Sequence, residues 1–464
     1  MRRAMHALLS AFDRETARRP DAPLAGPADA PLTRAAVEWL AGPAGAALDA
    51  TALPEGAVVG LRAADGPAFL AGLIALWRRG LVPLLLDASA PPLEARRLAL
   101  GIGAAALLRP EMVPGTFSGW AREALAPERA ASLPGIAAVK LTSGTAGEPK
   151  GIAVTAEALL ADAEAIVAAM SLRRDDRLLA AVPMSHSYGF SLLALPPLLG
   201  YGSVIVPGPG DPLVAAARSG ATVLPTVPAW LRAVARLPAP PRLPDALRLV
   251  IAAGEPLAGE TARAFRERLG RAPHVFYGAS ECGGVCYDPD GGAAERGTVG
   301  APLPGVSVTL RAGAGPDAVV VRSPAVARSY VPRAEARLEG GRFETDDCGS
   351  WIGGELRLHG RRGECITVHG RKVHPSEVEE VLAGLPGVEE VAVVGLSLPA
   401  GEGEAVRAVV ACAPGSLGAP QVLRWCRERL SPHKIPRSIL LVRALPRNAR
   451  GKVDRAALRT ADPR

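Results

Sequence analysis

The sequence predicts an α/β protein in which a large multi-sheet N-terminal domain precedes a small α+β C-terminal domain. Three observations lead there. The chain has 464 residues, of which 48% are hydrophobic and 21% charged, enough for roughly two to three domains with well-filled cores. Short apolar runs alternate with segments of helical periodicity over residues 55–280. The pattern then changes near residue 295 and again near residue 361.

The region 55–280 is expected to form parallel sheets covered by helices on both faces, because its apolar runs are continuous and separated by helical segments. The expected strands are Val58–Leu61, Leu81–Leu86, Ala104–Leu108, Ile136–Leu141, Leu178–Val182, Ser203–Val206, Leu247–Ile251 and His274–Phe276. The expected helices are Ala68–Arg79, Ala156–Met170, Pro228–Leu237 and Glu260–Leu269.

From about residue 295 to 360, turn residues and short alternating stretches indicate a small β-rich subdomain with strands at Val306–Leu310, Ala318–Arg322 and Glu355–His359. We place a domain boundary at about 361, giving a large domain over 1–360 and a small one over 361–464. In the small domain, Ser376-Glu-Val-Glu379 is interpreted as a capping box that opens a helix. Strands are expected at Val391–Gly395 and Ala405–Ala411.

Charge and composition narrow the classes of partner. The 53 Lys and Arg residues exceed the 46 Asp and Glu residues by seven, and the excess is scattered without a basic tract. This gives no support for a nucleic-acid partner, whereas an anionic small molecule would account for it. The apolar start is broken by Asp13 and Arg14, which favours an amphipathic first helix over a signal peptide. No membrane span is expected, because Pro196, Pro197 and Gly200 interrupt the longest apolar run.

The six cysteines contain no C-x-x-C pair, which fits reduced thiols better than a disulfide framework. The sequence therefore predicts a cytoplasmic protein.

The strongest chemical signal is a loop that follows an apolar strand directly: Leu141-Thr-Ser143-Gly144-Thr145-Ala-Gly147-Glu-Pro149-Lys150-Gly151. Its glycines allow the backbone N–H groups to approach a phosphate closely. The hydroxyls of Thr142, Ser143 and Thr145 add hydrogen-bond donors, and Lys150 adds a point charge. The spacing differs from a Walker A loop and from G-x-G-x-x-G, so the loop is interpreted as a phosphate site of another type.

This loop resembles the phosphate signature S-G-T-x-G-x-P-K-G of the adenylate-forming acyl- and aryl-CoA synthetases, a superfamily that includes nonribosomal-peptide adenylation domains and luciferases. The segment Phe276-Tyr277-Gly278-Ala279-Ser280-Glu281 is similar to that family's Y-G-x-[ST]-E element. The resemblance implies that Tyr277, Gly278 and Ala279 line adenine and that Ser280 meets the α-phosphate. It further implies that Glu281 ligates Mg²⁺, which prefers hard carboxylate oxygens.

Further motifs follow in the family's order. Thr345-Asp346-Asp347 stands where the family has T-G-D, which implies that Asp347 accepts hydrogen bonds from the ribose hydroxyls, although Asp346 replaces a glycine. Arg361 matches the arginine of the family's G-R pair near the ribose and phosphates. The residues Gly254, Glu255 and Pro256 match a block beside adenine.

The resemblance extends to the small domain. Lys452, within Pro446-Arg-Asn-Ala-Arg450-Gly451-Lys452, corresponds to the family's adenylation lysine and, with Glu281 and Thr145, completes the expected catalytic set. Gly363 stands at the family's hinge, where an Asp or Lys is usual. In the loop implied to form a thiol channel, Lys372 keeps a basic residue and Thr367 replaces one.

The wall of the carboxylate pocket is implied by Pro183-Met-Ser-His186-Ser-Tyr188-Gly189-Phe190, which resembles the family's P-x-x-H-x-x-G block. The expected lining residues are His186, Tyr188, Phe190 and Leu192. Their character suggests an apolar or aromatic acid, as in fatty-acid or aromatic-acid metabolism, but does not name it.

The resemblance covers nearly the whole chain, most weakly over residues 1–130. It implies a ligase that uses ATP and Mg²⁺ to convert a carboxylic acid to an acyl-adenylate and then transfers the acyl group to a thiol, with CoA as the first choice. Three alternatives stay open: a carrier-protein phosphopantetheine as acceptor, formation of a β-lactone, and nucleotide binding without turnover. A serine hydrolase is disfavoured because no G-x-S-x-G element occurs.

Overall fold

The computed structural model describes most of the chain. The described residues are 2–49, 53–113, 116–142, 150–208, 212–240, 242–312, 317–333, 337–361, 366–368, 371–373, 375–397, 404–448 and 453–460. They divide into two compact units. The first contains Met1–Val308 and Val321–Glu344, and the second contains Thr309–Val320 and Thr345–Arg464.

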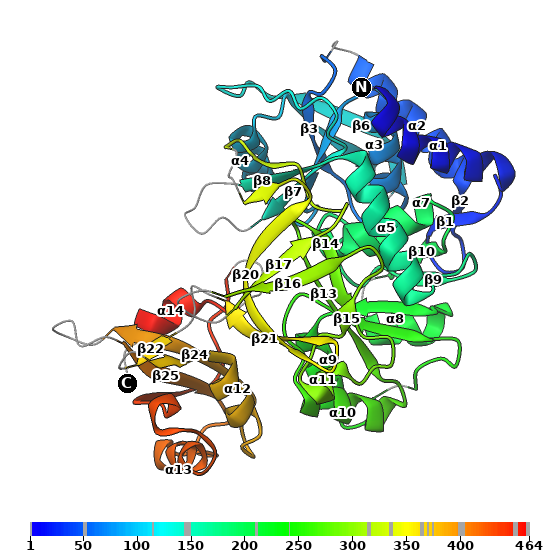
Figure 1. Ribbon diagram of the computed structural model, residues 1–464. Helices are drawn as coiled ribbons and strands as arrows, with labels where there is room; N and C mark the ends of the chain where they lie inside the picture. Colours follow the sequence, from blue (N-terminus) through cyan, green and yellow to red (C-terminus); the bar gives the residue numbers. More distant parts are fainter. Residues whose placement is uncertain are drawn as a thin grey trace. The chain divides into compact units, whose positions relative to one another are not determined.

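A nine-stranded sheet forms one half of the first unit (Figure 1). Its order is β15 (Ala301–Pro302), β14 (Gly283–Tyr287), β13 (Pro273–Ala279), β12 (Leu249–Ala252), β11 (Val223–Thr226), β9 (Arg177–Leu179), β10 (Ser203–Ile205), β1 (Pro23–Gly26) and β2 (Leu32–Thr33). The strands from β13 to β1 pair in parallel, whereas β14, β15 and β2 join antiparallel at the edges. The ends of the parallel strands β12 and β13 therefore lie side by side.

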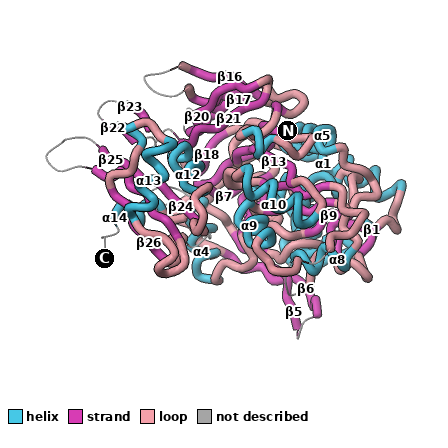
Figure 2. Tube along the Cα trace, turned by 90° about the horizontal axis from the view of Figure 1, so that it is seen from below, coloured by secondary structure: helices cyan, strands magenta, loops and turns pink. Residues whose placement is uncertain are grey.

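A seven-stranded sheet forms the other half of this unit. Its order is β18 (Ser329–Val331), β8 (Lys150–Val154), β7 (Ala138–Thr142), β4 (Val82–Leu86), β3 (Val58–Arg62), β5 (Ala106–Val113) and β6 (Thr116–Ala124). Strands β7, β4, β3 and β5 are parallel, and β18, β8 and β6 are antiparallel to their neighbours. Figure 2 shows β5 and β6 side by side as a long hairpin.

Helices cover these sheets and fill the core with small and branched aliphatic residues. They are α1 (Arg2–Arg18), α2 (Arg34–Asp49), α3 (Pro67–Arg78), α4 (Pro92–Ile102), α5 (Ala156–Met170), α6 (Ser187–Gly189), the π-helix η1 (Phe190–Ala194), α7 (Leu195–Leu198), α8 (Pro212–Ser219), α9 (Pro228–Ala235), α10 (Gly259–Leu269) and α11 (Ala293–Arg296). Helix α3 is buried along nearly its full length because its residues Phe69 to Trp77 are apolar or glycine. Helix α5 contacts β14, α1 and η1, so it packs deep within the unit.

The second unit has a core on each face of a three-stranded sheet. This sheet comprises β24 (Glu390–Ser397), β25 (Glu404–Ala411) and β26 (Ser438–Val442). Alternation places Val393 and Val410 against α12 (Pro375–Ala383) and α13 (Ala419–Arg429). The opposite face carries Val394 and Val409 against α14 (Arg455–Thr460).

The remaining strands are β16 (Ser307–Arg311), β17 (Ala318–Arg322), β19 (Leu338–Glu339), β20 (Arg342–Ile352), β21 (Glu355–Arg361), β22 (Ile366–Val368) and β23 (Arg371–Val373). Strand β21 pairs antiparallel with β20, and this register sets Asp347 opposite Arg361. Strands β22 and β23 form a separate hairpin.

The α/β fold class is confirmed, and the predicted helix over 156–170 and the strand over 318–322 have the expected bounds. The capping box is wrong. Ser376 lies inside α12, where its hydroxyl donates to the carbonyl of His359 at 2.7 Å, and Glu379 accepts from the N–H of Val393. Both side chains thus bond to other elements instead of the helix end. Among the described residues, no helix is long and apolar enough to cross a membrane.

Candidate active site

The predicted site residues fall into three groups in the structure. Six lie outside the described residues: Ser143, Gly144, Thr145, Gly147, Gly363 and Lys452. Two, Asp347 and Arg361, belong to the second unit, and the others belong to the first.

Thr142 and Lys150 flank the predicted phosphate loop. Thr142 ends β7 and Lys150 begins β8, and the two residues are cross-strand partners. The hydroxyl of Thr142 donates to the carbonyl of Lys150 at 3.4 Å. The Lys150 ammonium lies 3.9 Å from the centroid of the Tyr330 ring, within the range of a cation–π contact. The base of the loop is therefore a fixed hairpin that carries a positioned cation.

Glu281 approaches the same tyrosine from the nine-stranded sheet. It lies in the turn between β13 and β14, and its carbonyl accepts from the N–H of Ala327 at 2.7 Å. The hydroxyl of Tyr330 donates to Oε1 of Glu281 at 3.0 Å. The structure thus brings Lys150 and Glu281 together through Tyr330, a residue that the sequence analysis did not select.

The chemistry of Glu281 fits the predicted Mg²⁺. This cation typically takes one or two protein carboxylates and completes its shell with water and substrate phosphates. Among the described residues, no group of three or more His, Cys, Asp or Glu side chains could hold a metal. A single carboxylate beside a phosphate loop matches a cation that arrives with its nucleotide.

Ser280 connects the two motifs predicted around the acid and the α-phosphate. The hydroxyl of Ser187 donates to that of Ser280 at 2.7 Å, joining the start of α6 to the turn after β13. Tyr277 and Ala279 are half-buried near the end of β13, whereas Gly278 between them is exposed. A Cβ at Gly278 would come within 2.6 Å of the carbonyl oxygen of Gly283, so the turn requires glycine.

His186, which precedes α6, lies beside a carboxylate that follows β4. Its Nε2 lies 3.3 Å from Oδ2 of Asp87, which follows β4, and about half of the His186 side chain is exposed. Burial raises the pKa of Asp87, but hydrogen bonds from Ser89 and the nearby His186 outweigh it, so that this pKa lies below its usual value. An ionised Asp87 orients the Nε2 side of the ring toward itself.

Of the other predicted wall residues, Tyr188 is half-buried, whereas Phe190 and Leu192 are buried. Tyr188 donates its hydroxyl to the carbonyl of Ile251 at 3.1 Å, and burial raises its pKa. Phe190 and Leu192 are fully buried in η1, where Phe190 packs edge-on against Phe69. In this structure, His186 is the exposed member of the four.

Gly254, Glu255 and Pro256 follow β12 after one residue, Ala253. Gly254 has a φ of +92°, a conformation that favours glycine, and it is exposed. Because the parallel strands β12 and β13 end at one edge, this turn lies beside the predicted adenine segment.

A buried lysine near Phe190 was not predicted from the sequence. Lys140 on β7 is 2% exposed, and its Nζ lies 5.9 Å from the centroid of the Phe190 ring. Burial lowers the pKa of Lys140, although the nearby carboxylates of Asp162 and Glu281 oppose this shift. Asp162, also buried, accepts from the hydroxyl of Ser191 at 2.5 Å. Lys140 thus lies within electrostatic range of both Asp162 and Glu281.

In the second unit, Nε of Arg361 lies 3.5 Å from Oδ1 of Asp347. The N–H of Asp347 donates to the hydroxyl of Thr345 at 3.0 Å. The side chain of Asp347 is about one-fifth exposed and therefore accessible, whereas Asp346 on the same strand is exposed.

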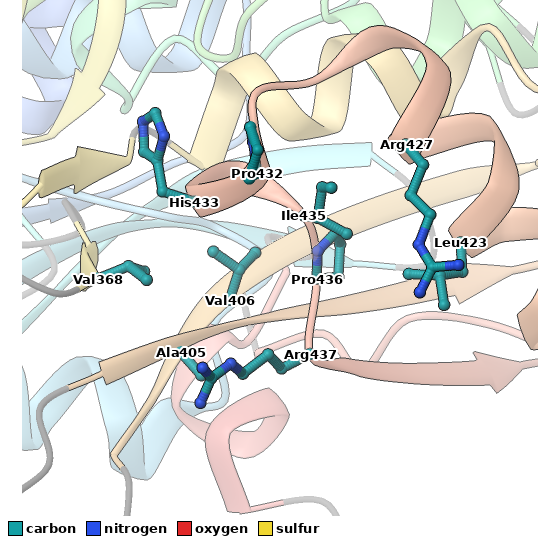
Figure 3. A pocket seen from close by; sticks show the side chains of 10 residues that line it. All are labelled: Val368, Ala405, Val406, Leu423, Arg427, Pro432, His433, Ile435, Pro436 and Arg437. Atoms are coloured by element: carbon teal, nitrogen blue, oxygen red, sulfur yellow. The ribbon is translucent and has the colours of Figure 1, made fainter.

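The second unit also has a pocket of about 720 Å³ that contains none of the predicted site residues. It is lined by Val368, Ala405, Val406, Leu423, Arg427, Pro432, His433, Ile435, Pro436 and Arg437. Figure 3 shows the apolar side chains of Val406 and Ile435 between His433 and Arg427.

Comparisons with known proteins identify the family. The AMP-binding enzyme family matches residues 12–331, and its C-terminal domain matches residues 377–452. A feruloyl-CoA synthase from Amycolatopsis sp is 31% identical over 354 residues, which cover 72% of this chain and 71% of the relative.

Two solved structures extend the likeness over nearly the full length. The amide bond synthetase McbA from Marinactinospora thermotolerans has a TM-score of 0.84 and 29% identity, covering 98% of this chain and 99% of that one. ATP-bound MatB from Rhodopseudomonas palustris has a TM-score of 0.83 and 26% identity, with 97% and 98% coverage. The chain belongs to the AMP-binding enzyme family.

Proposed function

We propose that this protein is an acid–thiol ligase that activates a carboxylic acid with ATP and then transfers the acyl group to CoA. In the first step the carboxylate attacks the α-phosphorus, forming acyl-adenylate and releasing pyrophosphate. In the second, a thiol attacks the activated carbonyl and AMP leaves. Family membership and the CoA-ligase relative support this reaction.

The observation that carries the proposal is the convergence of Lys150 and Glu281 on Tyr330. A cation at the end of the predicted phosphate loop and a carboxylate from the other sheet contact one tyrosine side chain, the cation at its ring and the carboxylate at its hydroxyl. This arrangement suits a triphosphate, whose negative oxygens bind the ammonium and whose accompanying Mg²⁺ binds the carboxylate. When bound, Mg²⁺ would offset the charge that accumulates on the phosphates.

The remaining roles are assigned as follows. The hydroxyls of the phosphate loop, Thr145 included, and Ser280 bind the phosphates, while Tyr277 and Gly254 border adenine. Asp347 and Arg361 bind the ribose, His186 faces the acid, and Lys452 stabilises charge during adenylation. In this proposal, residues 1–360 carry the nucleotide and acid sites, and residues 361–464 move about Gly363. The proposed location is the cytoplasm.

Carboxylate-dependent exchange between ATP and labelled pyrophosphate tests the first step, using a panel of aromatic and aliphatic acids. Exchange that requires an acid supports adenylation. If no acid supports exchange, the remaining alternative is a protein that binds nucleotide without turnover. Product masses after adding CoA, a phosphopantetheinylated carrier protein or an amine then identify the acceptor. The amine arm is included because McbA is an amide bond synthetase. A product lighter than its acid by one water would instead indicate a β-lactone.

A further inference from the structure

Tyr330 occupies the seam between the two sheets of the first unit. Its strand, β18, pairs with β8 on the seven-stranded sheet, with Tyr330 opposite Ile152. Just before this strand, the N–H of Ala327 donates to the carbonyl of Glu281 on the nine-stranded sheet. The backbone around Tyr330 is therefore anchored to both sheets, and its side chain is only 3% exposed.

The side chain makes a different contact at each of its ends. Its ring face receives the Lys150 ammonium at 3.9 Å, and its hydroxyl donates to Oε1 of Glu281 at 3.0 Å. A hydrogen bond to an ionised acceptor fixes direction, whereas a cation–π contact fixes position over a face. One buried, anchored side chain can thus set the location of a cation and of a carboxylate simultaneously.

We propose that Tyr330 is a positioning residue that pre-arranges Lys150 and Glu281 for Mg²⁺-ATP, with the hydroxyl serving the carboxylate and the ring serving the ammonium. The inference rests on the proposed function for the roles of Lys150 and Glu281. It goes further in assigning their alignment to a third residue and in separating the two contacts. Because Glu281 already accepts from Tyr330 through Oε1, this bond orients the whole carboxylate toward an incoming cation.

Two substitutions separate the contacts. Tyr330→Phe removes the hydroxyl and keeps the ring, and Tyr330→Leu removes both. Titration calorimetry measures ATP binding in EDTA and across a Mg²⁺ series. Tyr330→Phe should leave the affinity for ATP in EDTA unchanged. It should raise by roughly tenfold the Mg²⁺ concentration that gives half of the Mg²⁺-dependent increase in ATP affinity. Tyr330→Leu should also weaken ATP in EDTA by about threefold.

A double-mutant cycle with Glu281→Gln tests whether the hydroxyl acts through Glu281. In that background, Tyr330→Phe should cause no further change in Mg²⁺ dependence. Tyr201→Phe provides a matched control, because it removes a tyrosine hydroxyl from a half-buried position elsewhere in the same unit. Thermal unfolding of every variant measures any general loss of stability.

The proposal is overturned if Tyr330→Phe lowers only the melting temperature and leaves the Mg²⁺ dependence of ATP binding at the wild-type value. It is also overturned if the effect persists in full beside Glu281→Gln. These readouts need no acid and no turnover, so they are separate from the exchange assay. If Mg²⁺-ATP binding depends on Tyr330 as predicted but the wild-type protein exchanges no pyrophosphate with any acid, the proposed function is refuted and the inference is retained.

Discussion

Arg361 lies across from Asp347 in the β20–β21 hairpin, with Nε 3.5 Å from Oδ1. The two predicted ribose-binding residues are therefore neighbours in the structure. The pair is worth little to folding, because Arg361 is about two-thirds exposed and exposed ion pairs contribute about 0–1 kcal/mol. Its significance is geometric: antiparallel pairing brings together two residues that are separated in the sequence.

Asp347→Ala should weaken ATP binding by roughly 10–150-fold, since hydrogen bonds to a charged group are worth about 1.5–3 kcal/mol. Stability should change little for the reason just given. Asp346→Ala is the matched control on the same strand and should leave the affinity unchanged. Calorimetric titration with ATP measures both. If Asp346→Ala proves to be the weaker binder, the assignment of the ribose to Asp347 is wrong.

Lys452→Ala should reduce acyl-adenylate formation by about 10²–10³-fold, the usual effect of losing one electrostatic contact with a transition state. Thioester formation from supplied acyl-adenylate should stay largely intact, because the lysine is expected to face the site only in the first step. Pyrophosphate exchange and CoA-thioester release measure the two steps separately. Equal losses in both would contradict a role confined to adenylation.

Gly363→Pro should block one of the two half-reactions, because proline fixes φ near −65° and a pivot must adopt two backbone conformations. Adenylation that survives without thioester formation would identify the frozen orientation as the first. The same two assays apply, with circular dichroism to verify folding. A variant that completes both steps at wild-type rates would place the pivot elsewhere.

Asp87→Asn should raise the KM for the acid several-fold and leave the KM for ATP unchanged. The carboxylate orients His186 from 3.3 Å, and an amide in its place cannot favour one ring orientation electrostatically. Steady-state exchange assays with each substrate varied in turn measure this split. A change confined to the KM for ATP would show that Asp87 contributes to nucleotide binding instead.

The sequence predicts the elements and motifs of this protein better than the contacts between them. Hydrophobic periodicity was sufficient to predict the bounds of α5 and β17, because the pattern of buried residues largely determines the structure of these elements. The antiparallel edge strands could not be predicted, since the direction of a strand leaves no mark in its hydrophobic pattern. Tyr330 was missed for a related reason. Its role depends on β18 pairing with β8, a contact between residues about 180 positions apart.

The capping box shows the opposite error, in which a correct local pattern is overruled by tertiary contacts. Ser376 and Glu379 have the right spacing, but His359 and Val393 offer partners from other elements. The burial of Lys140 was likewise not predicted, because the sequence shows only a single cation within an apolar run. Its burial follows only from the packing of β7 near Phe190.

Asp65→Asn should stabilise the protein at neutral pH. Burial, opposed by the N–H of Met184 and reinforced by the charge of Asp87, raises the pKa of Asp65 to about 6. A carboxyl whose pKa is higher in the folded state binds more protons there than in the unfolded chain between about pH 4 and pH 6. Stability is therefore lost as the pH rises through this window, by at most about 3 kcal/mol.

The asparagine keeps an oxygen for the Met184 N–H, which donates to Asp65 at 2.7 Å, and it carries no charge. Its advantage over the wild type should be small at pH 4 and largest above pH 6. Urea unfolding of both proteins at pH 4, 5, 6 and 7.5 measures the difference, with the exposed Asp175→Asn as the control. A difference that stays constant across this range would mean that Asp65 titrates alike in the folded and unfolded chains.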